Sequence, residues 1–104
     1  MKEIYELESQ IREELNDAEK YVDCALAKKD TYPSLSALYL KLSIEEIGHA
    51  NSLHTEVEKM IEAYRREHGE PSERMLGRYE YAHQIYIEQA NRIKAKQGIF
   101  KESK

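Results

Sequence analysis

Glu46 and His49 are the residues of this sequence best suited to chemistry, because their Glu-x-x-His spacing places a carboxylate and an imidazole on the same side of a helix. They fall within an apolar series that steps by three and four positions: Leu35, Leu38, Tyr39, Leu42, Leu53, Val57, Met60 and Tyr64. This spacing predicts a helix face turned toward a core. A carboxylate on such a face must be protonated, ion-paired or bound to a metal, since burying it unpaired costs several kcal/mol. The pair is therefore a candidate metal site.

The same spacing recurs at Glu80 and His83. A chain with four histidines and many glutamates produces it by chance, so the spacing alone is a weak indication of metal binding. We give more weight to Glu46 and His49, which continue the apolar series, and keep His83 as a second-choice ligand.

The alternation of helix-forming stretches with proline and glycine predicts three helices, at about 3–28, 34–67 and 72–97. Pro33 begins the second helix, and Gly69 with Pro71 separates it from the third. Residues 98–104 carry neither a cap nor a helical pattern, so we expect a frayed tail in which Phe100 is the candidate anchor. At 104 residues, the chain is expected to be a single all-α domain, built from a long antiparallel helical hairpin and a third helix.

Glu14 is the third candidate ligand. It lies about 15 residues before the end of the first helix, while Glu46 and His49 lie about 12 and 15 residues after the start of the second. At the rise of an α-helix, these heights in an antiparallel hairpin agree within ~5 Å. Glu13 and Asp17 flank Glu14, but only position 14 continues the apolar series of the first helix.

The expected second helix is ~50 Å long, whereas a compact domain of this size is only ~26 Å across. One chain cannot cover such a helix evenly. We therefore expect a homo-oligomer of at least two chains.

Two carboxylates and an imidazole form a hard, oxygen-rich donor set suited to iron or manganese, with zinc also possible. The stretch from Glu14 to Tyr21, followed by Glu46 and His49, resembles the first half of the ferritin-like and rubrerythrin-like di-iron carboxylate proteins. The resemblance covers roughly residues 5–65. It implies a non-haem di-iron site in which Glu14 is the terminal carboxylate, Glu46 the bridging carboxylate and His49 the histidine ligand.

In that family a second helix pair repeats the ligand set, and here the repeat is missing as such. One chain offers half a site, as in the encapsulated ferritins, whose similar half-bundle dimerises. Two copies would complete a ferritin-like four-helix bundle with four carboxylates and two histidines. Glu80 and His83 could complete the site within one chain only if they lay at the height of His49. Their expected height differs from it by roughly 10 Å along the helix axis, so His83 is available only if the third helix is swapped or bent.

Structural alternatives remain for each of these residues. Glu46 and His49 can form an internal hydrogen-bonded pair that sets helix register. Glu14 can lie at the edge of the helix contact and reach water, and His83 can be a hydrogen-bonded core or interface residue. His54 and His68 are expected at the surface.

Two functions follow from these alternatives. The first is a ferritin-like protein that oxidises ferrous iron with oxygen or peroxide, which would make it a ferroxidase-type oxidoreductase. The second is a metal-free helical interaction module with buried Glu–His pairs.

The formal charge of −4 argues against nucleic acid as a partner. No stretch approaches the ~20 apolar residues that span a membrane, and the first residues do not resemble a signal peptide, so we expect a cytoplasmic protein.

Overall fold

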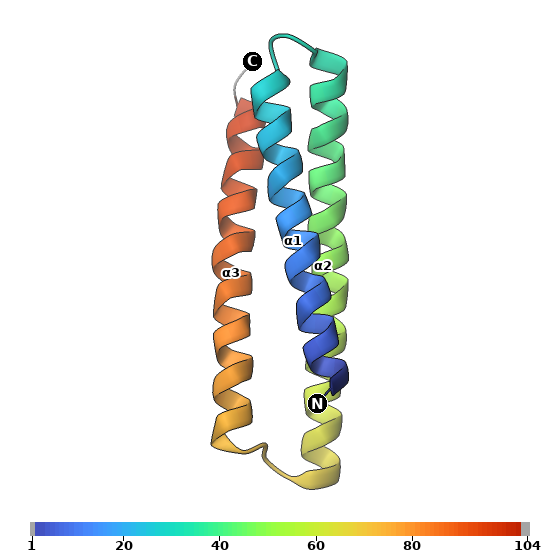
Figure 1. Cartoon of the computed structure of the whole chain (residues 1–104), viewed down its shortest axis with the longest axis vertical. Coiled ribbons are helices and arrows are strands. Elements are labelled where there is room, and N and C mark those ends of the chain that lie inside the picture. The colour runs from blue at the N-terminus through green and yellow to red at the C-terminus, as the bar shows by residue number, and fades with distance from the viewer. Residues whose placement is uncertain (1, 103–104) are drawn as a thin grey trace.

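The computed structural model describes residues 2–102, which form three helices and no strand (Figure 1). Their bounds are α1 Lys2–Lys28, α2 Pro33–His68 and α3 Glu73–Glu102. The expected all-α class is confirmed. The helices run side by side along a rod of 55 × 17 × 16 Å. No helix among the described residues has the length and apolar character needed to cross a membrane.

The two turns form where proline and glycine predict them. Pro33 occupies the first turn of α2, where its missing N–H costs nothing. Gly69 ends α2 with a φ of 78°, a conformation that glycine adopts without strain, and its N–H donates to the Arg65 carbonyl at 2.9 Å. The Ser72 hydroxyl accepts a hydrogen bond from the Met75 N–H at the start of α3.

The expected frayed tail is wrong for residues 98–102, which continue α3. The Lys29 ammonium donates to the Phe100 carbonyl at 2.7 Å and lies 4.6 Å from the centre of the Phe100 ring. Phe100 is thus the anchor of this segment, as expected, and its contacts with Lys29 hold the end of α3 against the turn between α1 and α2. Residues 103–104 of the expected tail lie outside the described residues.

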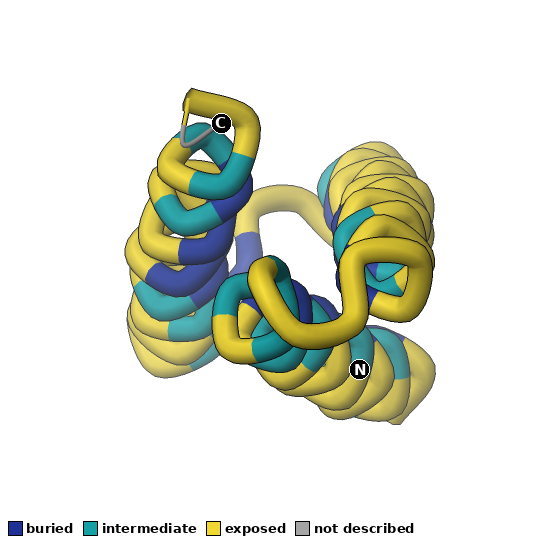
Figure 2. The backbone as a smooth tube through the Cα atoms, turned by 90° about the horizontal axis from the view of Figure 1, so that it is seen from above, coloured by how far each residue is buried: buried dark blue, intermediate teal, exposed yellow. Residues whose placement is uncertain are grey.

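The contact between α1 and α2 follows a line of buried residues spaced by seven, which we call the seam. It contains Ile4, Ile11, Ala18 and Ala25 of α1 with Ser36, Ser43, Ala50 and Val57 of α2. Small side chains let the backbones approach closely, so the Ser43 hydroxyl donates to the Ala18 carbonyl at 2.7 Å and the Ser36 hydroxyl to the Ala25 carbonyl at 2.5 Å. Figure 2 shows the buried residues on the sides of the helices that face one another.

The seam corrects the expected core face of α2. Leu35 and Leu38 of the apolar series are exposed, at 38% and 49%, while Ser36 and Ser43 are fully buried. The physical reason is that a serine hydroxyl can be satisfied by a carbonyl of the neighbouring helix, which makes serine better suited than leucine to a close helix contact.

Half-buried residues beside the seam form a second surface, which we call the lateral face. It contains Leu7, Glu14 and Tyr21 of α1 with Tyr39, Leu42, Glu46, Leu53 and Met60 of α2. At 3.6 residues per turn, these positions lie on the opposite side of the seam from Asn51 and His54, two α2 residues that contact α3. The α3 helix therefore leaves the lateral face uncovered.

A charged cluster fastens α3 to α1. The Arg92 guanidinium donates two hydrogen bonds to the Glu19 carboxylate, at 2.7 and 2.8 Å. Lys96 bridges Glu19 and Asp23 at 3.0 and 2.9 Å, and Gln89 donates to Asn16 at 2.9 Å. The hydrogen bonds from Arg92 are the main reason that the pKa of Glu19 is lowered to about 2, and Lys96 and Gln89 lower it further against the effect of burial.

Glu19→Gln should lower the free energy of unfolding by about 1–2 kcal/mol at neutral pH, because it removes the charge from a bidentate ion pair. A lowered pKa means that the stabilisation is complete above the ordinary value of 4.5 and is lost as the pH falls toward about 2. The difference between wild type and variant should shrink over that window, measured by urea unfolding. Glu13→Gln, an exposed position on the same helix, should show little change. If the free energy of unfolding of Glu19→Gln stays below that of wild type by the same amount down to pH 2, this assignment is wrong.

Candidate metal centre

The structure brings Glu14 of α1 together with Glu46 and His49 of α2. One ligand atom from each of these residues lies within 4.8 Å of the others. His49 Nδ1 is 3.2 Å from Glu46 Oε1 and 3.6 Å from Glu14 Oε2. Two helices of one hairpin therefore supply three convergent donors at one height along the rod.

The three residues lie on the lateral face and not in the core, which corrects the expectation that Glu46 and His49 point into it. The side chain of Glu46 is 19% exposed and that of Glu14 is 29% exposed, while His49 is 59% exposed. The carboxylates are thus held partly out of water, and the imidazole closes the cluster on the solvent side.

Glu14 destabilises the charged form of Glu46. The neighbouring Glu14 raises the pKa of Glu46 to about 7, because protonated Glu46 can share its proton with Glu14, and burial and the Glu14 charge act in the same direction. The charge of His49 opposes this shift, while that of Asp17 adds to it. Near neutrality the pair therefore needs either a proton or a cation between its oxygens.

Glu14 Oε2 is a buried atom without a hydrogen-bond partner among the described residues. A buried acceptor left unpaired costs about 1–3 kcal/mol, and either the proton of Glu46 or a bound cation would satisfy it. Two carboxylates and one imidazole fit iron or manganese, with zinc also compatible. The donor set thus fits a divalent metal, and three ligands from one chain leave positions open for further ligands.

Two of the remaining histidines lie elsewhere. His83, the second-choice ligand, is on α3, where its Nδ1 is 3.0 Å from His54 Nε2 and outside the Glu14 cluster. His54 was expected at the surface but is only 15% exposed, because α3 covers it. Its seven-residue spacing from Ile47 and Ile61, both buried, is the signal that sequence reasoning overlooked. Glu80 is exposed.

Two tyrosines of the lateral face contact each other one heptad beyond the carboxylates. The rings of Tyr21 and Tyr39 lie 6.0 Å apart at an interplanar angle of 25°. This ring contact links α1 to α2 at that end of the lateral face.

No protein-family model matches this chain, and neither a curated protein nor a solved structure shows significant similarity to it.

The pKa of Glu46 predicts an unusual pH dependence of stability in the metal-free protein. Between pH 4.5 and about 7 the folded chain retains a proton that the unfolded chain has released. The contribution of the Glu46 carboxyl group to the free energy of unfolding must therefore fall as the pH rises through that window, and it must stay constant above the window. Glu46→Gln cannot ionise, so it should match wild type near pH 4.5 and exceed it in stability above pH 7, as measured by urea unfolding with a chelator present. A variant that is less stable than wild type above pH 7 would be inconsistent with a strained carboxylate pair.

Proposed function

We propose that the chain is a ferritin-like, non-haem di-iron protein that oxidises ferrous iron with oxygen or peroxide at a site shared between two copies. The observation that carries this proposal is the convergence of Glu14, Glu46 and His49 on an uncovered face of the hairpin. The arrangement agrees with the resemblance of the Glu14 to His49 segment to the di-iron carboxylate proteins.

The need for a second copy follows from the ligand count and from the surface around the site. One chain offers two carboxylates and one imidazole, which is half of the set that holds two metals in ferritin-like bundles. The half-buried Leu42 and Leu53 flank the ligands, and exposed Leu35 lies further along the same face. A twofold copy of the hairpin against this face would bury these side chains and complete a four-helix bundle with four carboxylates and two histidines.

The protein residues would bind and balance charge, and the ferrous pair would supply electrons to the oxidant. Carboxylate oxygens stabilise both ferrous and ferric iron, so Glu14 and Glu46 can hold the metal before and after oxidation. Cation binding would release the proton that Glu46 retains up to about pH 7, so metal affinity should rise with pH over the same range. His49 would contribute a nitrogen donor from the side of the cluster that faces the second copy.

One observation favours the second candidate function, a metal-free helical interaction module with Glu–His pairs. His49 Nδ1 lies 3.2 Å from Glu46 Oε1, so the two side chains contact each other directly without any metal. In that case the same lateral face would still pair with another helical hairpin. The two functions differ in whether the protein retains iron when it is purified without chelator, which elemental analysis measures.

Ferrous titration under air should show rapid growth of near-ultraviolet ferric absorbance with wild type. Glu46→Ala and His49→Ala should each slow the reaction at least about tenfold, since loss of a direct ligand costs no less than loss of an outer-shell partner. His68→Ala removes a 58% exposed histidine outside the cluster and serves as the control. Equal rates of ferric product formation in wild type and Glu46→Ala would contradict the proposed oxidase function.

Assembly is tested separately by sedimentation velocity. Leu42→Lys places a charge on the lateral face one turn from Glu46, so it should shift the protein from dimer to monomer, because a buried ammonium is not tolerated in an apolar contact. Ile44→Lys changes an exposed apolar residue outside the lateral face and should leave the dimer intact. If wild type sediments as a monomer with and without ferrous iron under anaerobic conditions, the shared site is wrong.

A further inference from the structure

Two imidazoles meet on the opposite side of the hairpin from the lateral face. His54 of α2 and His83 of α3 approach to 3.0 Å between His54 Nε2 and His83 Nδ1. Only 15% of the His54 side chain is exposed. This contact links two helices that otherwise meet at few polar points, among them Tyr86 with Asn51 and Gln97 with Ser43.

Glu58 sets the tautomer of His54. Its Oε1 lies 3.3 Å from His54 Nδ1, and this contact with a negative carboxylate favours the tautomer that carries the proton on Nδ1. His54 Nε2 then carries a lone pair directed at His83. A carboxylate behind an imidazole in this way is the usual outer-shell arrangement of metal-binding histidines, because it orients the ring and increases the basicity of the free nitrogen.

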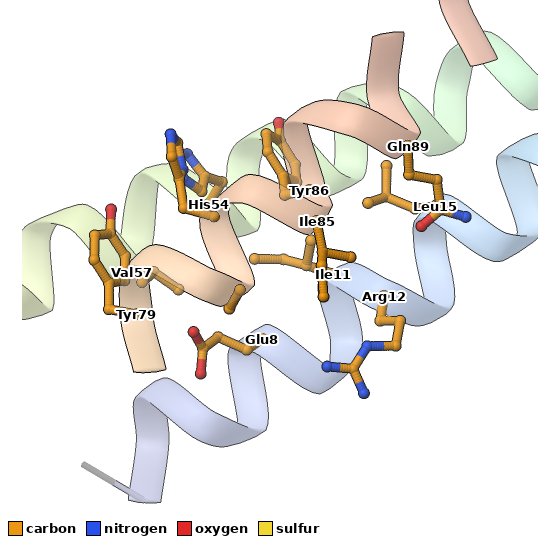
Figure 3. A pocket seen from close by; sticks show the side chains of 12 residues that line it. Glu8, Ile11, Arg12, Leu15, His54, Val57, Tyr79, Ile85, Tyr86 and Gln89 are labelled. Atoms are coloured by element: carbon orange, nitrogen blue, oxygen red, sulfur yellow. The ribbon is translucent and has the colours of Figure 1, made fainter. Parts of the chain in front are cut away.

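The surroundings keep His54 neutral and leave room beside it. Burial lowers the pKa of His54, and the nearby His83 acts in the same direction, while Glu58 opposes them. The Tyr86 ring lies nearly parallel to His54, with centres 4.6 Å apart. A cavity of about 30 Å³ adjoins the pair (Figure 3), which exceeds the roughly 10–15 Å³ that one water needs. Glu8 and Arg12 of α1 line its other side.

We propose that His54 Nε2 and His83 Nδ1 form a second metal site, which takes a late first-row divalent cation such as Ni²⁺ or Cu²⁺. Metal–imidazole bonds of about 2.0–2.1 Å, combined with nitrogens 3.0 Å apart, give an angle at the metal of roughly 90–100°. That angle suits two adjacent positions of a tetragonal nickel or copper centre better than a tetrahedral one. Water from the cavity and from solvent would occupy the remaining positions.

The proton balance of this site is simple. The hydrogen on His83 Nδ1 moves to His83 Nε2, so both imidazoles stay neutral. The cation would lie to one side of the line between the two nitrogens, and both rings would rotate to direct their lone pairs at it. The contact between His54 and Glu58 is retained. The bound cation would tie α2 to α3, whereas the iron site proposed for the lateral face involves only α1 and α2. The two sites also differ in chemistry, since one is rich in carboxylate oxygen and the other offers only imidazole nitrogen.

The test uses nickel ions and calorimetric titration in a Glu46→Ala, His49→Ala background, so it does not depend on the proposed iron site. A single nickel ion per chain is expected. His54→Gln and His83→Gln should each weaken binding at least about tenfold, and Glu58→Gln should weaken it by about tenfold through loss of the outer-shell carboxylate. His68→Gln is the matched control, since His68 is 58% exposed and lies at the end of α2, and it should not change the affinity.

Proton NMR of the histidine rings provides a readout that a purely structural role would not change. Nickel should broaden the ring signals of His54 and His83 before those of His68. Variants are compared only where circular dichroism shows wild-type helix content, and His83→Asn replaces His83→Gln if the latter unfolds. Equal nickel affinity in folded His54→Gln and in the parent, or broadening that begins at His68, would show that the pair is only a hydrogen bond between helices and would overturn the proposal.

Discussion

The close contact between α1 and α2 depends on the small side chains of the seam. Ala18 and Ser43 have no exposed surface, and the Ser43 hydroxyl reaches the Ala18 carbonyl because neither residue holds the backbones apart. A buried hydroxyl without an acceptor would cost about 1–3 kcal/mol, so this bond sets the register of the hairpin as well as its spacing. Glu14 lies one turn from Ala18 and His49 lies less than two turns from Ser43, so the candidate metal centre depends on the same register.

The seam divides the hairpin into two sides with different electrostatics. On the α3 side, Arg92 donates two hydrogen bonds to Glu19, which lowers the pKa of that carboxyl to about 2. On the lateral face, Glu46 lies beside Glu14, which is the main reason that its pKa rises to about 7. The Glu19 carboxylate is stabilised as an anion because Arg92 lies beside it. The Glu46 carboxylate is destabilised as an anion because Glu14 lies beside it. A surface that strains its own carboxylates is suited to binding a cation.

The apolar pattern of the sequence was misleading about which face of α2 is buried. Leucines at positions 35 and 38 pointed to one stripe, while the structure buries Ser36 and Ser43. Hydrophobicity assigns serine to the surface, since it takes no account of a carbonyl on the neighbouring helix that can accept the hydroxyl. The same limitation explains His54, whose burial depends on α3 and its partner His83. Local patterns do not contain information about a helix that packs from elsewhere in the chain.

The sequence by itself determined the three helices, the hairpin turns and the common height of Glu14, Glu46 and His49, because helix propensity, proline, glycine and a constant rise per residue are local properties. Only the tertiary structure decided how far each ligand is exposed, which histidine pairs with which, and where α3 ends. Those features depend on the rotation of each helix about its axis. That rotation is determined by the close packing of small residues in the seam and by the ion pairs between α1 and α3. Both are contacts between residues that lie far apart in the sequence.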